Sequence, residues 1–418
     1  MNNAVRLLAL NNTLSLCRKS AFYKNRVPGY PLTSIQELKT IPLTTKEDIR
    51  NNSPFGMVCV PNKDLYQYHE TFGTTGIPAS AWLSKEDLLD NARRINMCGI
   101  NFNEDDIVLI RFPYAISTIA HLTQAAAQGK GACVIPASSR TTVSPFSRIV
   151  KLMKKLNVTV LACLPLQATL IAETAEMMKL IPGKDFPNLR AIFTGGEMLH
   201  PGRRKTIENI WGVPVYDNYG MTETGPSIID CKFGVPHPIE DSFIFELLDD
   251  DYKEEVKPGQ IGNLVITTLT RKATPVIRYI TGDRAQIIQV ECKCGKKTSL
   301  LIRGRKQDVL EVNRKVLDMW DLEEILSHLP ACRFWIAGPV RDKLKFIIEQ
   351  VNTLENIDPS LISSLESKFG IGLGIEYVPK GVLYDRRELL NVGVVGKPKY
   401  IYSAQEMMEK AYFNSSKN

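Results

Sequence analysis

The chain has 418 residues, of which 44% are hydrophobic, 23% charged and 8% aromatic, a composition that excludes a disordered or fibrous protein. The net charge of +7 is the small difference between 52 basic and 45 acidic side chains, and the densest basic cluster, residues 303–306, is short, so we expect no nucleic-acid partner. No apolar stretch reaches the roughly 18 residues of a membrane span and no signal peptide is recognised, so we expect a soluble, cytoplasmic protein without membrane contact.

Residues 1–66 alternate short helical patterns with proline and polar breaks, and the segment 43–48 has a threonine followed by acidic residues, which is helix-start chemistry. From about residue 105 to 215, short apolar runs alternate with stretches of helical length. We predict buried strands and helices in the following places: strands at 107–112, 131–136, 158–164 and 191–194, and helices at 146–156 and 167–180. Successive β-α units predict a doubly wound, mostly parallel sheet, in which ligands bind at the carboxyl ends of strands.

A different pattern follows from about residue 228 to 302, where strands alternate with turns, and it predicts a β-rich subdomain with strands at 242–247, 262–268 and 285–290. Mixed patterns return after residue 305, with strands at 334–337 and 345–351 and a helix at about 360–369. We therefore predict an α/β fold with two domains: a large N-terminal domain, 1–305, and a small α+β C-terminal domain, 306–418.

Four short segments carry residues suited to nucleotide chemistry. The first, 71–78 (TFGTTGIP), is dense in hydroxyls and glycine, and glycine lets the backbone approach a phosphate closely. An ordinary surface turn has the same composition, and the GxxxxGK[ST] pattern is not matched. The other three segments are 194–197 (TGGE), 216–225 (YDNYGMTETG) and 279–283 (YITGD).

In this order and at these separations, the four segments resemble the core motifs of the adenylate-forming superfamily, which includes acyl-CoA ligases, luciferase-like enzymes and peptide-synthetase adenylation domains. Within it, the chain is most similar to the phenylacetate-CoA ligase branch, and segments 38–48 and 302–310 extend the likeness over about residues 30–330. The resemblance implies that ATP and a small carboxylic acid, aryl or arylacetic, form an acyl-adenylate, which is passed to the thiol of CoA.

The resemblance also implies roles for single residues. Thr222 would contact the α-phosphate and Glu223 would bind Mg²⁺, a hard cation that prefers carboxylate oxygen. Asp283 would accept both ribose hydroxyls with the assistance of Arg305. The remaining positions of the implied ATP site are Thr71, Gly73, Thr74, Thr75 and Gly76 at the β,γ-phosphates, and Gly195, Gly196, Glu197, Asp217, Asn218, Tyr219 and Gly220 around the adenine, with the Tyr219 ring stacked on it.

Two further regions take roles from the same resemblance. Phe112, Tyr114 and His121 lie where the superfamily places part of its acyl pocket, although aromatic residues near a strand end are more often plain core. The small domain of the superfamily rotates between an adenylating and a thiol-transferring pose about a hinge acid, which is Asp308 here. Lys397 corresponds to the lysine that touches the carboxylate and α-phosphate, and Lys399 is its rival.

A separate group combines Cys231 and His237 with the tight turn Cys292-Lys293-Cys294-Gly295. Three thiolates and one imidazole match a closed tetrahedral Zn²⁺ site, and the turn resembles a zinc knuckle. Some phenylacetate-CoA-ligase-like enzymes hold zinc at the matching positions. With no open coordination position, such a zinc would be structural. Four unrelated reduced side chains are the alternative.

Two other functions stay open at this point. A stand-alone adenylation enzyme would load the phosphopantetheine thiol of an acyl carrier protein in natural-product biosynthesis. A degenerate, non-catalytic nucleotide-binding partner would explain three departures from the superfamily pattern: Ala79 where lysine is common, Asn313 in place of a glycine-containing loop, and the missing Pro-Arg-Thr before Lys397.

Overall fold

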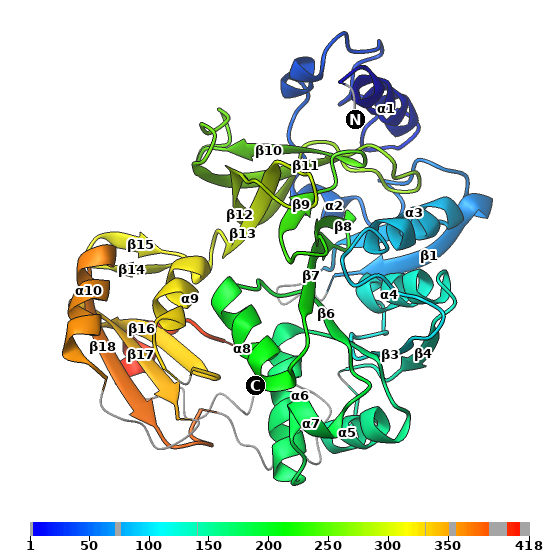
Figure 1. The fold of residues 1–418 in the computed structure, drawn as a ribbon. Coiled ribbons are helices and arrows are strands. Elements are labelled where there is room, and N and C mark those ends of the chain that lie inside the picture. Colours follow the sequence, from blue (N-terminus) through cyan, green and yellow to red (C-terminus); the bar gives the residue numbers. More distant parts are fainter. Residues whose placement is uncertain are drawn as a thin grey trace.

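The computed structural model describes residues 3–71, 77–139, 141–330, 332–350, 357–383 and 399–409. A large body contains the chain from the N-terminus to β13, and a smaller body at the lower left of Figure 1 contains β14 to β18. No described helix combines the length and apolarity that crossing a membrane requires.

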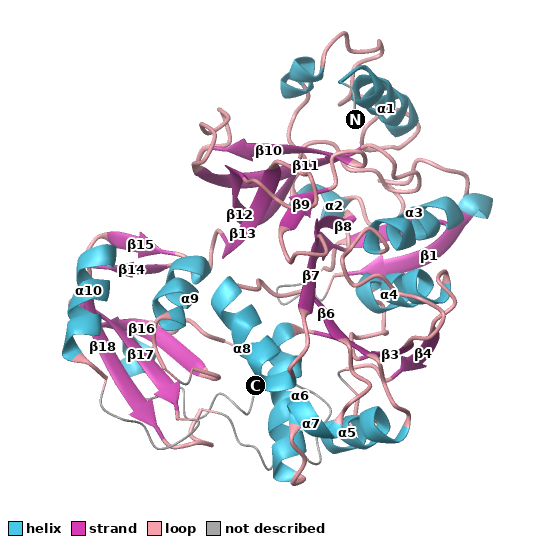
Figure 2. Ribbon diagram, viewed as in Figure 1, coloured by secondary structure: helices cyan, strands magenta, loops and turns pink. Residues whose placement is uncertain are grey.

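A seven-stranded sheet forms the centre of the large body (Figure 2). Its order along the sheet is β4 (Cys133–Pro136), β3 (Ile107–Ile110), β5 (Val160–Cys163), β6 (Ala191–Gly195), β7 (Val215–Met221), β8 (Gly225–Asp230) and β9 (Pro236–Pro238). The first five strands pair in parallel, and the β7–β8 and β8–β9 pairings are antiparallel. The connecting helices are α4 (Thr118–Gln128), α5 (Phe146–Lys155), α6 (Pro165–Met177), α7 (Pro182–Asp185) and α8 (Pro201–Trp211). The predicted α/β class is confirmed, and the predicted strands and helices of this region differ from the observed ones by at most three residues at an end.

The short apolar runs are strands because both faces of this sheet are covered. Val108 and Ile110 of β3 pack in one core cluster, whereas Leu109 between them packs in another on the opposite face. β5 repeats the alternation with Ala162 and Cys163. Since successive side chains of a strand point to opposite faces, a strand with two covered faces must be apolar throughout.

The predicted β-rich region is a four-stranded antiparallel sheet of β10 (Phe243–Leu248), β11 (Ile261–Thr268), β12 (Tyr279–Gln289) and β13 (Thr298–Arg305). The prediction for β12 was wrong at its start, because the strand begins at Tyr279 and not at residue 285. The motif Thr281-Gly282-Asp283 therefore lies inside a strand, where residues are alternately buried and half-buried. This placement sets Asp283 directly opposite Arg305 in the β12–β13 ladder.

The N-terminal lead-in packs on this antiparallel sheet (Figure 1). It consists of α1 (Asn3–Cys17), η1 (Ile35–Thr40), α2 (Lys46–Asn51) and η2 (Asn62–Asp64), followed by the hairpin β1 (Leu65–Glu70) and β2 (Ser80–Ser84) and by α3 (Lys85–Ile95). The predicted helix start is present, since the Thr45 hydroxyl accepts from the Asp48 amide and the Asp48 carboxylate accepts from the Thr45 amide.

The small body has its own apolar core. Its elements are β14 (Leu310–Val312), β15 (Lys315–Leu317), α9 (Met319–Ser327), β16 (Trp335–Val340), β17 (Lys343–Glu349), α10 (Pro359–Phe369), β18 (Gly372–Val378) and α12 (Ala404–Met408). Asn313 and Arg314 join β14 to β15 with φ angles of 50° and 65°. Two consecutive positive φ angles are typical of a tight hairpin turn whose twist matches that of its strands.

Candidate active site

Two of the motif segments meet where β6 and β7 run side by side. The Thr194 hydroxyl donates to Asp217 Oδ1 at 2.5 Å, and Asn218 Nδ2 donates to the Thr194 carbonyl at 3.0 Å. A side chain at Gly195 would have its Cβ only 2.6 Å from Asn218 Nδ2. Gly196 has a φ of +81°, which favours glycine. The glycines therefore let the end of β6 lie against the 216–219 segment without a clash.

The Asp217 carboxylate is held inside the sheet. Burial, together with the nearby Asp230 carboxylate, raises the pKa of Asp217 to about 7. Asp230 in turn accepts from the Asp217 amide at 2.6 Å and pairs with Arg204 at 2.6 Å. The side chain of Asp217 thus ties β7 to β6, and its amide is bonded to Asp230 of β8.

The third and fourth motif segments meet at Asp283. The Tyr219 hydroxyl of β7 donates to Asp283 Oδ2 at 2.6 Å, and Arg305 Nε of β13 lies 3.1 Å from Asp283 Oδ1. Burial and the Asp283 carboxylate both raise the pKa of Tyr219, so its hydroxyl stays protonated and donates. Tyr219, Asp283 and Arg305, the three residues expected to contact the nucleoside of ATP, are thus neighbours in space.

Glu223 follows β7 and is buried, with 2% of its surface exposed. Its Oε1 accepts from the Tyr279 hydroxyl at 2.9 Å, while Oε2 is enclosed and has no hydrogen-bond partner among the described residues. The guanidinium of Arg271 is close enough for the Glu223 charge to act on the pKa of Arg271, and Arg271 also donates to the Thr222 carbonyl at 3.4 Å. A buried carboxylate oxygen without a donor fits a Mg²⁺ ligand, because hard cations prefer such oxygens.

Several predicted residues lie at or beyond the limits of the described chain. Thr71 closes the base of its loop, since its amide donates to the Ala79 carbonyl at 2.9 Å and its hydroxyl accepts from the Ala79 amide at 3.1 Å. Asp308 is described, and its amide donates to the Arg305 carbonyl at 3.1 Å. The predicted residues that lie outside the described residues are Gly73, Thr74, Thr75, Gly76 and Lys397.

Two of the three acyl-pocket candidates, Tyr114 and His121, form an aromatic cluster with a residue of β1. Phe112 is fully buried in the core, whereas Tyr114 lies 5.3 Å from the His121 ring, measured between centroids. His69 belongs to no motif in the sequence, yet its ring lies 5.4 Å from that of His121. Burial is the main cause that lowers the pKa of His69 to about 4, with His121 and Arg271 contributing, so His69 is neutral at physiological pH. Tyr114 Oη is enclosed without a hydrogen-bond partner in the described chain.

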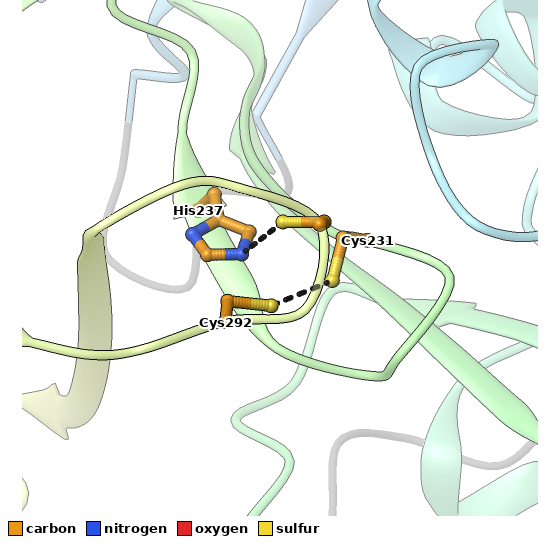
Figure 3. A group of neighbouring side chains, drawn as sticks. Cys231, His237 and Cys292 are labelled. Atoms are coloured by element: carbon orange, nitrogen blue, oxygen red, sulfur yellow. Dashed lines mark hydrogen bonds between the residues drawn. The ribbon is translucent and has the colours of Figure 1, made fainter.

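The cysteine and histidine side chains gather at one point, with all four ligand atoms of Cys231, His237, Cys292 and Cys294 within 4.8 Å of one another. Figure 3 shows Cys231 and Cys292 pointing toward each other from two separate segments, and their sulfur atoms lie 3.6 Å apart. Cys294 Sγ lies 3.3 Å from His237 Nε2. These short separations are compatible with four ligands around one ion.

The protonation of His237 also suits metal binding. Its Nδ1 lies 2.6 Å from the Thr298 carbonyl, which can only accept, so Nδ1 carries the proton. Nε2, which faces the sulfur atoms, is then left with a free lone pair. A second hydrogen bond that fixes the tautomer in this way is typical of metal-bound histidine.

A model of the AMP-binding enzyme family matches residues 26–270, more than half of the chain. The chain therefore belongs to the AMP-binding enzyme family. Within it the chain is similar to the phenylacetate-coenzyme A ligase of Thermus thermophilus, with 29% identity over 336 residues that cover 75% of this chain and 74% of the relative. The phenylacetate-coenzyme A ligase of Pseudomonas putida is also 29% identical, over 317 residues that cover 71% of this chain and 70% of the relative. The predicted resemblance to the adenylate-forming superfamily and its phenylacetate-CoA ligase branch is confirmed.

Solved structures show the same fold. A 2-hydroxyisobutyryl-CoA ligase in the postadenylation state matches with a TM-score of 0.84 at 20% identity, covering 100% of this chain and 92% of that one. The same ligase in the thioesterification state matches with a TM-score of 0.68 at 20% identity, covering 98% and 91%. Because these are two arrangements of one protein, the present structure is more similar in overall arrangement to the first.

Proposed function

We propose that the protein uses ATP to activate a small carboxylic acid and transfers the acyl group to CoA. In the first step a carboxylate oxygen attacks the α-phosphate of ATP, which gives an acyl-adenylate and releases pyrophosphate. In the second step the thiol attacks the acyl carbon, the bond to AMP breaks, and a thioester forms. The likeness to phenylacetate-coenzyme A ligases supports both steps.

The observation that carries the proposal is the buried, half-satisfied carboxylate of Glu223 beside the Tyr219–Asp283 pair. Glu223 would hold Mg²⁺, which neutralises phosphate charge when it is bound. Thr222, the preceding residue, would contact the α-phosphate. Asp283 and Arg305 would bind the ribose, because a carboxylate can accept from both of its hydroxyls. Glu223 thus lies beside the proposed nucleoside site and can serve the phosphates.

The remaining roles are proposed on the family resemblance. The loop that begins at Thr71 would hold the β,γ-phosphates, and Lys397 would approach the α-phosphate during adenylation. For the acid we propose an aryl or arylacetic substrate next to Tyr114 and His121, whose aromatic rings offer contacts to an aromatic acid.

We also propose that the structure has the arrangement that precedes thiol transfer, with Asp308 as the hinge between residues 1–305 and the small domain. The higher TM-score against the postadenylation state than against the thioesterification state supports this arrangement. A hinge needs only a few residues that absorb the backbone rotation.

For the cysteine and histidine cluster we propose a structural Zn²⁺. The ion would join the segment of Cys231 and His237 to the turn of Cys292 and Cys294, which are about 60 residues apart in the chain. Four protein ligands leave no position for a substrate, so the ion would stabilise the fold and take no part in the reaction.

The test is thioester formation by the purified protein with ATP, Mg²⁺ and a panel of acids, read by mass spectrometry. CoA and a phosphopantetheinylated carrier protein compete in the same reaction. We expect an acyl-CoA, with aryl and arylacetic acids used most efficiently. Exclusive acylation of the carrier protein would overturn the CoA assignment, and no acylation of either acceptor would overturn the proposed function.

A further inference from the structure

One helix of the small body presents its acidic side to the large body. The apolar residues Leu322, Ile325 and Leu326 of α9 face the core of the small body. Its carboxylates make ion pairs with residues of β13 and α8, and Figure 1 shows α9 beside α8. The pairs are Arg303 with Asp318 and Asp321, and Arg203 with Glu323. His200 precedes α8 and lies 3.2 Å from Glu324, but burial lowers its pKa to about 4, so this contact is not an ion pair at neutral pH.

Arg203 of α8 contacts residues of both bodies. Its Nη2 donates to Glu323 Oε1, and its Nη1 donates to the Tyr400 hydroxyl at 3.1 Å. The guanidinium carbon also lies 4.8 Å from the centroid of the Tyr400 ring. On its other side, Nη1 lies 4.0 Å from Glu197 Oε2, and this oxygen accepts from the Leu166 amide at 3.3 Å. One guanidinium therefore joins a motif residue of the nucleotide site to two residues of the small body.

Burial makes this connection strong. The side chain of Glu323 is 5% exposed and that of Arg203 is 12% exposed. Burial alone would lower the pKa of Arg203, but Glu323, Tyr400 and Glu197 outweigh it and raise the pKa above its ordinary value, so the guanidinium remains charged. Removing one partner of such a pair leaves the other charge buried and uncompensated, which is a much larger effect than the loss of an exposed salt bridge.

Tyr400 is fixed to the small body and cannot follow α8. The amide of Ala337 in β16 donates to the Tyr400 carbonyl at 2.8 Å, and the Tyr400 ring stacks on Trp335 with centroids 4.8 Å apart. Glu323 is fixed there by α9. A rotation of the small body relative to α8 must therefore separate Arg203 from both partners, so these contacts stabilise one arrangement and not the other.

We propose that Arg203 is a positioning residue that holds the small domain in the arrangement of this structure, through Glu323 and Tyr400, against the segment that contains Glu197. The role of this arrangement in the reaction rests on the proposed function: it would favour adenylation, and release of Arg203 would accompany thiol transfer. Arg203 then acts on the balance between the two half-reactions without touching the reacting atoms.

The test compares the half-reactions in Arg203→Met, Arg203→Lys and Glu323→Gln. We expect Arg203→Met to lower acid-dependent pyrophosphate exchange about tenfold or more through kcat, while the rate of thioester formation from supplied acyl-adenylate is unchanged or higher. Arg203→Lys should restore part of the exchange, and Glu323→Gln should resemble Arg203→Met. Lys205→Met is the matched control, because Lys205 is an exposed cation on the same helix with no partner in the described chain. Equal loss of both half-reactions in folded Arg203→Met, or unchanged exchange in both Arg203→Met and Glu323→Gln, would overturn the proposal.

A second measurement separates this proposal from the proposed function. Hydrogen–deuterium exchange without substrates reports the contact between α8 and α9 directly. We expect faster hydrogen exchange of the α9 amides in Arg203→Met and Glu323→Gln than in the wild type and Lys205→Met. If no acid supports pyrophosphate exchange in the wild type, the proposed function fails. Faster hydrogen exchange of α9 in the two variants would still support the role of Arg203 in domain placement. Unchanged exchange at α9 in both variants would overturn that role.

Discussion

Replacing Glu223 with glutamine should separate catalysis from stability. The carboxylate is buried, and the Tyr279 hydroxyl at 2.9 Å is its hydrogen-bond donor among the described residues, with Oε2 left without one. Glutamine keeps the shape and can still accept from Tyr279, and it removes a charge that is costly to bury. We therefore expect the free energy of unfolding to change by no more than about 1 kcal/mol.

The same change should strongly impair adenylation. A hydrogen bond or ligand interaction of a charged group contributes about 1.5–3 kcal/mol. At about 1.36 kcal/mol for each factor of ten, the loss of a carboxylate ligand to Mg²⁺ should lower the rate of pyrophosphate exchange about 10- to 160-fold.

Tyr279→Phe is the matched comparison, because it keeps the Glu223 charge and removes its donor. We expect this variant to lose about 1.5–3 kcal/mol of stability in denaturant unfolding without ligand, since the buried carboxylate is left unsatisfied. A functional carboxylate thus predicts that Glu223→Gln loses more activity than Tyr279→Phe, whereas Tyr279→Phe loses more stability. Wild-type exchange in Glu223→Gln, or a parallel fall of its stability and activity, would refute the reasoning.

Three further predictions concern the nucleoside, the metal and the domain contact. Asp283→Ala should raise the apparent KM for ATP about 10- to 160-fold, and a steady-state ATP titration that shows an unchanged KM would contradict the ribose assignment. Elemental analysis should give one zinc per chain, and Cys292→Ser should lower both metal content and thermal stability, whereas the exposed Cys133→Ser should lower neither; a metal-free wild type would remove the zinc proposal. Burial lowers the pKa of His200 to about 4 against the opposing influence of Glu324, so between about pH 6.5 and 4 the unfolded chain binds more protons than the folded one and the free energy of unfolding should fall as the pH falls. In His200→Asn this pH dependence should be smaller by up to about 1.4 kcal/mol per pH unit. An unchanged pH dependence in urea unfolding would contradict the prediction.

The parallel sheet could be predicted because its physical cause is local. Strands such as β5 and β6 are buried on both faces, so their side chains are mostly apolar and the run is visible in the sequence. The start of β12 could not be predicted in this way. Thr281, Gly282 and Asp283 have the composition of a turn, and pairing of β12 with β11 on one side and with β13 on the other holds them in a strand.

The candidate site was predicted in part by its motifs, which name residues but not their contacts. The motif positions Tyr219 and Asp283 are 64 residues apart and hydrogen-bonded. The motif did not reveal that Tyr279 donates to Glu223, because this contact depends on how β12 approaches the end of β7. Arg203 belongs to no motif, and its role is visible only once α8 and α9 are placed side by side.

Acid-dependent exchange of labelled pyrophosphate into ATP reports adenylate formation itself, because only reversible formation of an acyl-adenylate produces it. The wild-type protein is incubated with ATP, Mg²⁺ and labelled pyrophosphate, with and without each acid of an aryl, arylacetic and short aliphatic panel. We expect exchange that depends on the acid and on Mg²⁺ and that falls at least tenfold in Glu223→Gln. Nucleotide binding without exchange for any acid would contradict it and would indicate a nucleotide-binding protein that does not form adenylates.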